Sequence, residues 1–187
     1  ISEESERLSN MVEELLDFSR IQGGRFNLNK ANMDVFAELT DAVIIYSEKA
    51  RQENKTLLYD EPQEIVTIFG DRNRIRQVFI NIIDNAIKYS AAYGHIIVAT
   101  AVTDKAVIIT VEDDGCGIEP ERLKQILASL EIEKNTTKIG VFNIYQRLKL
   151  YYDDKFSFDI KSSLKKGTCI TISIPRESTA EPEGSIL

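Results

Sequence analysis

The segment ending at Tyr89 constrains the fold most, because it reads as a helix with one polar stripe on an otherwise apolar surface. Asn81, Asn85 and Lys88 are separated by four and three residues, which places them on one side of a helix. The other side carries apolar residues at helical spacing: Ile75, Val78, Phe79, Ile82, Ile83, Ala86 and Ile87. Carboxamide oxygens can ligate Mg²⁺ and a lysine is a point charge for phosphate, so the stripe suits a polyanion with a hard cation.

A second motif, Asp113-Asp-Gly-Cys-Gly-Ile118, ends a run of β-branched residues. Gly115 and Gly117 allow the backbone to approach a flat ligand closely. The two motifs together predict a nucleotide-binding site.

The motifs resemble the N box and the first glycine box of sensor histidine kinases, which belong to the Bergerat-fold ATPases with DNA gyrase and heat-shock chaperones. Residues 5–24 resemble the second helix of the dimerisation and phosphoacceptor domain, and residues 165–175 resemble the closing strand of the catalytic domain. The resemblance therefore extends over nearly the whole chain in the family's order, which makes it specific.

Three regions are expected. Residues 1–24 form the C-terminal part of a dimerisation helix, residues 25–176 the ATP-binding catalytic domain, and residues 177–187 a disordered tail. The apolar stripe at Leu8, Val12 and Leu15 needs a partner, which is either a second copy or the chain's own domain; we favour a homodimer. Gly23-Gly24 is expected to end this helix and act as a hinge.

The pattern within residues 25–176 alternates helices with strand pairs. It predicts strands over 25–33, 56–59, 65–69, 95–102, 105–112, 156–162 and 168–174, and helices from an Asp34 cap to about 54, from an Asp71 cap through 89, over 119–127 and over 139–152. This order indicates an α/β two-layer sandwich with a mixed sheet, the Bergerat-type fold that the resemblance implies, preceded by a helical segment.

The resemblance assigns Asp113 to the adenine amine, a contact that selects adenine over guanine. The alternative is a turn aspartate that caps the following loop. Asp114 is the competing carboxylate, but the spacing to the glycines places it one position out of register.

The resemblance also implies the remaining ATP and Mg²⁺ contacts. Asn85 would ligate Mg²⁺, with Asn81 supporting the metal or the phosphates, and Lys88 and Tyr89 would reach phosphates and sugar. The other nucleotide contacts are expected at Gly115, Gly117, Ile118, Gly140 and Thr168. The alternative for the helix stripe is a solvated face, although such faces usually mix acids and lysines rather than repeat Asn.

Asn81 also bears on the mechanism, because Bergerat ATPases that hydrolyse ATP carry a Glu at this position. An amide cannot act as a general base, so Asn81 and Lys88 are expected to position ATP for transfer to an external histidine rather than for hydrolysis. By resemblance, that histidine lies outside this chain and the phosphoryl group then passes to a response regulator receiver domain. His95, in a predicted strand without the acceptor motif, is interpreted as structural.

Two departures from the family pattern keep other functions open. No aromatic box is recognisable between Glu119 and Lys138, and the second glycine box is reduced to Gly140 and Asn143, which still leaves a helix N-terminus that could face phosphate. The alternatives are a non-catalytic nucleotide-sensing or partner-binding module, and a structural dimerisation fragment with a vestigial pocket.

Composition narrows the partners. The net charge of −7 and the lack of a basic tract argue against nucleic acid. Two distant cysteines favour a reducing compartment, and no run is long enough to span a bilayer. We therefore expect the cytoplasmic catalytic portion of a sensor whose full-length form could be membrane-anchored.

Overall fold

A five-stranded mixed sheet forms the base of the fold in the computed structural model, which describes residues 28–132 and 140–176. The strand order is β2 (Thr56–Tyr59), β4 (His95–Val102), β5 (Ala106–Asp113), β7 (Gly167–Pro175) and β6 (Ser157–Ser163). β2 pairs with β4 in parallel and all other neighbours are antiparallel. A separate antiparallel pair joins β1 (Ala31–Asp34) to β3 (Thr67–Gly70).

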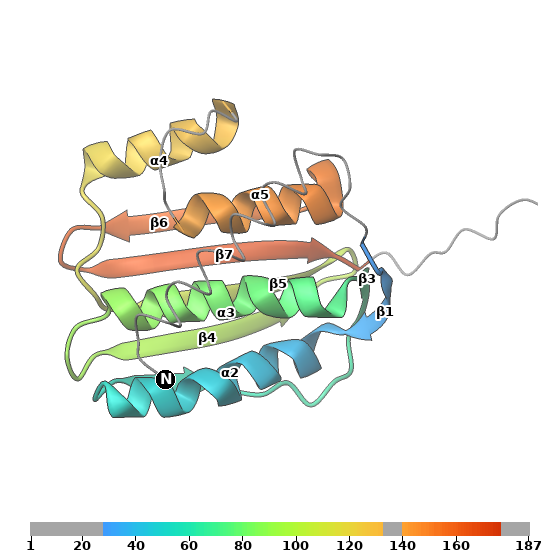
Figure 1. Cartoon of the computed structure of the whole chain (residues 1–187), viewed down its shortest axis with the longest axis horizontal. Coiled ribbons are helices and arrows are strands. Elements are labelled where there is room, and N and C mark those ends of the chain that lie inside the picture. The colour runs from blue at the N-terminus through green and yellow to red at the C-terminus, as the bar shows by residue number, and fades with distance from the viewer. Residues whose placement is uncertain (1–27, 133–139, 177–187) are drawn as a thin grey trace, which may run out of the picture.

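Three helices cover one face of the sheet, as Figure 1 shows. They are α2 (Val35–Gln52), α3 (Arg72–Tyr89) and α5 (Gly140–Tyr152). A fourth helix, α4 (Pro120–Ile132), packs against α5 and β6, and a short 3₁₀ helix (Asp153–Lys155) follows α5. The expected two-layer α/β sandwich with a mixed sheet is confirmed.

The two predicted helix caps are present. The Asp34 carboxylate accepts a hydrogen bond from the Phe36 backbone N–H at 3.0 Å, and the Asp71 carboxylate accepts one from the Arg74 N–H at 3.3 Å. Each side chain satisfies a donor that the first turn of its helix leaves without a partner. The starts of α2 and α3 are therefore set by local sequence.

The apolar side of α3 is the centre of the core. Every residue predicted for that face is buried: Ile75, Val78, Phe79, Ile82, Ile83, Ala86 and Ile87. Inward-facing side chains of the sheet, Val107, Ile109 and Ile172 among them, belong to the same core cluster. Because α3 is held along its whole length, the direction of its polar stripe is fixed as well.

Two elements have a boundary that differs by more than two residues from the sequence expectation, and the others agree more closely. β1 begins at Ala31 rather than at residue 25, although residues 25–27 lie outside the described range. α4 continues to Ile132 instead of ending near 127, because Ile126 and Leu130 extend the helical spacing and are both buried. The predicted dimerisation helix, its hinge at Gly23-Gly24 and the tail at 177–187 also lie outside the described residues.

No helix within residues 28–132 and 140–176 combines the length and the apolar character needed to cross a bilayer.

A buried carboxylate joins α2 to α3. The Glu38 side chain is only 2% exposed and pairs with Arg72 at 3.0 Å and with Arg76 at 2.6 Å. Arg76 also donates to Asp41 at 2.7 Å. The network compensates a charge that would otherwise be costly to bury.

Arg76→Ala should therefore destabilise the protein by about 1–3 kcal/mol, because it leaves the buried Glu38 with one cationic partner fewer. Arg51→Ala is the matched control: its ion pair with Glu48 on α2 is exposed, with side chains 78% and 55% accessible, so solvent screens it and its loss should change stability little. Urea unfolding followed by circular dichroism measures both free energies. Equal losses in the two variants would contradict a structural role for the Glu38 network.

Candidate functional site

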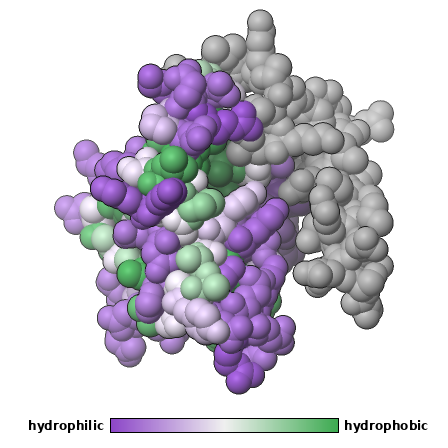
Figure 2. All heavy atoms as spheres, turned by 90° about the vertical axis from the view of Figure 1, so that its left-hand side faces the viewer, coloured by the Kyte–Doolittle hydropathy of each residue, from purple (hydrophilic) through white to green (hydrophobic). Residues whose placement is uncertain are grey.

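A cavity of about 410 Å³ lies between α3, α4, the start of α5 and the ends of β5 and β7. Its lining residues are Ile82, Asn85, Ala86, Tyr89, Val111, Asp113, Cys116, Gly117, Ile118, Glu119, Arg122, Ile126, Gly140, Val141, Ile160, Thr168 and Ile170. Figure 2 looks onto this end of the molecule, where apolar side chains gather in a hollow bordered by hydrophilic residues.

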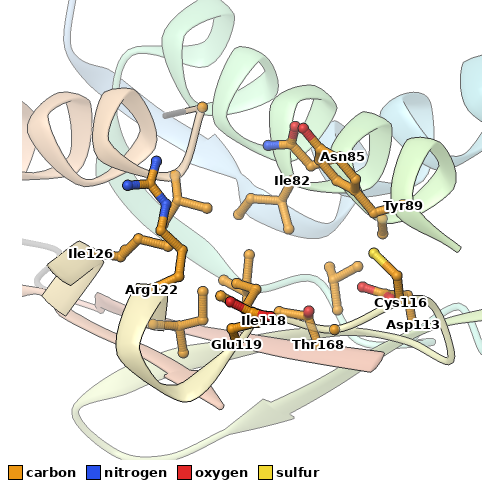
Figure 3. Close-up of a pocket in the computed structure, with 17 residues that line it drawn as sticks. Ile82, Asn85, Tyr89, Asp113, Cys116, Ile118, Glu119, Arg122, Ile126 and Thr168 are labelled. Atoms are coloured by element: carbon orange, nitrogen blue, oxygen red, sulfur yellow. The ribbon is translucent and has the colours of Figure 1, made fainter. Parts of the chain in front are cut away.

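The walls of the cavity are mostly apolar and carry few polar groups. Ile82 comes from the helical layer, and Val111 and Ile170 come from the sheet. Asn85, Asp113 and Thr168 provide polar groups among them (Figure 3). An apolar slot with a few convergent polar groups suits a flat aromatic ligand whose edge is read by hydrogen bonds.

Asp113 is the last residue of β5 and is 7% exposed. One carboxylate oxygen accepts a hydrogen bond from the Gly115 backbone N–H at 2.9 Å. Burial raises the pKa of the Asp113 carboxyl above its usual range, although hydrogen bonds from the Gly115 and Thr168 backbones work in the opposite direction. The cavity thus contains a desolvated acid whose orientation the backbone fixes.

Two glycines make the close packing around Asp113 possible. Gly117 and Gly167 have φ angles of +64° and +92°, which L side chains rarely adopt. A Cβ atom on Gly117 would lie 1.9 Å from the Ser163 carbonyl oxygen, and one on Gly167 would lie 1.7 Å from the Asp113 carbonyl oxygen. The strand ends and loops below the cavity are therefore in direct backbone-to-backbone contact, with no side chain between them.

Ser162 joins these segments by hydrogen bonds. Its hydroxyl oxygen accepts from the Ile118 N–H at 2.9 Å and lies 2.9 Å from the Thr168 hydroxyl. It also donates to the Gly167 carbonyl oxygen at 2.9 Å. The glycine loop after β5 and the start of β7 are thereby held in one arrangement.

Only one of the three residues in the polar stripe of α3 lines the cavity. Asn85 lines it, and a Cβ on Gly140 would lie 3.1 Å from the Asn85 amide nitrogen, so the start of α5 lies directly against this side chain. Asn81, one turn earlier, accepts a hydrogen bond from Gln77 at 3.1 Å and is not among the lining residues. Lys88 is also outside the lining, with its ammonium 5.2 Å from the centre of the Tyr89 ring.

Seven of the residues predicted for nucleotide contact line the cavity: Asn85, Tyr89, Asp113, Gly117, Ile118, Gly140 and Thr168. Asn81, Lys88 and Gly115 do not line it, so their contacts with ligand stay predictions. Sequence reasoning missed the other lining residues, which include Cys116, Glu119, Arg122 and Ile126. A helical register drawn from Pro120 would have placed Arg122 and Ile126 on one side of α4.

The neighbouring carboxylate has a different position. Asp114 accepts hydrogen bonds from the His95 backbone N–H at 2.9 Å and the Ser90 hydroxyl at 3.1 Å, and lies 3.3 Å from the His95 ring nitrogen. It is not among the lining residues. Asp114 thus ties together the loop before β4 and the end of β5.

The polar groups of the cavity suit a metal ion that is held mainly by the phosphates of a bound nucleotide and only partly by the protein. Within the described ranges, no three His, Cys, Asp or Glu side chains gather into a metal-binding group. Asn85 brings an amide oxygen to the cavity, and Mg²⁺ commonly combines one or two protein oxygens with phosphate oxygens and water. A nucleotide-borne Mg²⁺ therefore fits the residues present.

Asp113→Asn should leave the fold as stable as the wild type, or more stable, at neutral pH, because it removes a buried charge and keeps an acceptor for Gly115. The raised pKa sets the sign: the acid destabilises the folded state above its folded pKa, and this penalty disappears as falling pH protonates it. The advantage of the variant should therefore shrink as pH falls. Unfolding curves between neutral and acidic pH test this, and a variant less stable than wild type at neutral pH would contradict it.

Residues 70–178, more than half of the chain, match the family described as histidine kinase-, DNA gyrase B-, and HSP90-like ATPases. The chain is 28% identical to sensor protein SrrB of Staphylococcus aureus over 183 residues, which cover 94% of this chain and 31% of SrrB. It thus spans less than a third of the length of the curated relatives it matches first.

Solved structures of histidine kinases have a similar fold. The Acinetobacter baumannii histidine kinase AdeS superimposes with a TM-score of 0.72 at 25% identity, covering 92% of this chain and 80% of that one. Histidine kinase ThkA, in a complex with the response regulator protein TrrA, shares the fold with a TM-score of 0.69 at 22% identity, over 93% of this chain and 48% of ThkA. The chain belongs to the histidine kinase-, DNA gyrase B- and HSP90-like ATPase family and is the ATP-binding region of a sensor histidine kinase.

Proposed function

We propose that this region binds Mg²⁺-ATP and transfers the γ-phosphoryl group to a histidine on a phosphoacceptor domain. The observation that carries the proposal is the buried carboxylate of Asp113 at one end of an apolar cavity that also contains Asn85 and the first residues of α5. Base recognition and phosphate binding then occupy different ends of one site.

Asp113 is proposed to accept a hydrogen bond from the adenine exocyclic amine. Guanine carries a carbonyl oxygen at the corresponding position, which a carboxylate would repel. The Gly115 N–H and the surrounding backbone hold the acid in place, so recognition needs little reorganisation on binding.

ATP should accordingly bind in clear preference to GTP, and Asp113→Asn should weaken ATP binding by about 1.5–3 kcal/mol, the range for a hydrogen bond to a charged group. Isothermal titration calorimetry with Mg²⁺ measures both. Because the same substitution should preserve stability, a loss of affinity cannot be attributed to unfolding. Equal affinity for ATP and GTP, or an Asp113→Asn variant that binds ATP normally, would contradict this assignment.

The phosphate end is proposed to be formed by Asn85 and the α5 N-terminus. Helix N-termini present free N–H groups and a positive dipole end, both of which favour phosphate. Asn85 would give its amide oxygen to a nucleotide-borne Mg²⁺, which supplies charge neutralisation on the phosphates when bound. Asn81, one turn away, is proposed to support this arrangement through the metal's water shell.

The α3 stripe lacks a group able to activate water. Asn81 carries an amide where hydrolytic relatives carry a Glu, and an amide is not a general base near neutral pH. Transfer to an imidazole needs no such base, because a neutral imidazole nitrogen is itself a nucleophile. Phosphoryl transfer then depends mainly on positioning and charge neutralisation.

The isolated chain should therefore hydrolyse ATP very slowly, yet label a phosphoacceptor domain supplied separately from a related sensor kinase. The product should be an acid-labile, alkali-stable phosphohistidine, followed with γ-labelled ATP. Asp113→Asn is the matched negative control. ATP binding without any transfer would favour the alternative of a nucleotide-sensing module, and label on His95 of the chain itself would contradict the interpretation of that residue as structural.

The partners follow from this activity. ThkA has been solved with a response regulator, and we propose a receiver domain as the downstream partner of this chain. Residues 1–24 are proposed to belong to a dimerisation helix, residues 25–176 to the catalytic domain and residues 177–187 to a tail. The catalytic portion is proposed to be cytoplasmic, in a full-length protein that could be anchored in the membrane.

A further inference from the structure

We propose that Arg122 binds the phosphate chain of the nucleotide and provides the cationic group of the cavity. The inference rests on the proposed function and adds a residue that neither the α3 stripe nor the glycine box contains. It follows from the charge of the cavity, the position of α4 and the freedom of the Arg122 side chain.

The charge of the lining calls for a cation. Its acidic lining residues are Asp113 and Glu119. Among residues 28–132 and 140–176, Arg122 is the one basic residue that lines the cavity. A nucleoside triphosphate keeps net negative charge even with one Mg²⁺ bound. Without Arg122, the described part of the cavity would offer that ligand two carboxylates and no positive side chain.

Arg122 lies at the end of the cavity where phosphates are expected. Figure 3 shows Arg122 and Ile126 at one end and Asp113 and Cys116 at the other. A nucleotide whose base contacts Asp113 must extend its phosphates away from that residue. The direction of the cavity thus carries the phosphates toward α4 and the start of α5.

Packing fixes the side of α4 that faces the cavity. Ile126 is 3% exposed and lines the cavity. Arg122 precedes it by four residues and so lies on the same side of the helix, one turn nearer the N-terminus. The burial of Ile126 therefore keeps Arg122 directed along the cavity wall.

The guanidinium is free to change partner. Among the described residues, its hydrogen bond goes to the exposed Gln125 side chain at 3.2 Å. A contact between two exposed polar side chains contributes little, because water replaces it readily. A phosphate offers two acceptor oxygens that match the planar guanidinium fork and a full opposite charge.

Lys88, the cation expected from the sequence, is less suitable. Its ammonium lies over the Tyr89 ring, and the residue is outside the cavity lining. Lys134 and Lys138 fall between α4 and α5, outside the described residues. Arg122 is consequently the cation that the described residues place on the cavity wall.

The test compares three ligands that share the base and differ in phosphates. The full 187-residue chain is titrated with adenosine, ADP and ATP in the presence of Mg²⁺, with protein NMR shifts as the readout, since these report weak binding as well as fold. Arg122→Ala should weaken ATP binding about tenfold, as expected for losing a charge-assisted contact, and leave adenosine binding unchanged. Arg122→Lys should lie between, because it keeps the charge and loses the fork.

Lys124→Ala is the matched control. It removes a cation from the same helix, but Lys124 is 76% exposed, pairs with Glu121 and does not line the cavity, so ATP affinity should be unchanged. Arg122→Ala with wild-type ATP affinity, or with equal losses for adenosine and ATP, would overturn the inference while the proposed function stands. A wild-type chain that binds none of the three ligands would overturn the proposed function and this inference with it.

Discussion

The burial of α3 against the sheet is the constraint on which the site depends. Its apolar face is held by Ile75, Phe79, Ile82, Ile83 and Ile87, each at most 2% exposed. Successive helix residues point about 100° apart, so this packing leaves Asn85 no freedom to turn away from the cavity. Ile82 and Ala86 belong to the buried face and also line the cavity, so the packing that stabilises the fold shapes the site directly.

Asp113 imposes an opposite energetic demand on the same structure. Its pKa is raised chiefly by burial, which means that the charged form is disfavoured where it stands. The fold tolerates it because backbone N–H groups donate to the carboxylate and because Gly167 lets β7 approach without a clash. In the proposed function, an adenine amine would give this carboxylate a further hydrogen-bond donor. This is the pattern expected of a recognition group rather than of a structural one.

The sequence predicted most of this architecture, because the signals for it are local. The α3 face follows from helical period, the Asp34 and Asp71 caps from short-range hydrogen bonding, and the β4–β5 pair from two β-branched runs. The parts that it did not predict depend on contacts between distant segments. In the sequence, Glu38 looks like an ordinary surface acid, because its burial and its ion pair with Arg76 depend on the packing of α2 against α3. The hydrogen bonds of Ser162 likewise depend on the pairing of β6 with β7. Helical spacing placed Lys88 on the same side of α3 as Asn85, but it could not predict the conformation of the long side chain. The Lys88 ammonium lies over the ring of Tyr89, the last residue of α3.

The two ends of the cavity are built by different means. At the Asp113 end, which is proposed to bind the base, Gly117, Gly167 and the Ser162 hydrogen bonds hold the strand ends and the loop backbone together, a rigid arrangement that would favour selectivity for one base. At the other end, the walls are Asn85 of α3, the start of α5 and one face of α4, and the long Arg122 side chain of α4 can reorient without disturbing the sheet. The proposed function, which needs a firmly held base and a γ-phosphoryl group released to another protein, would use this division: selectivity would come from the sheet, and adaptability from helix ends and long side chains.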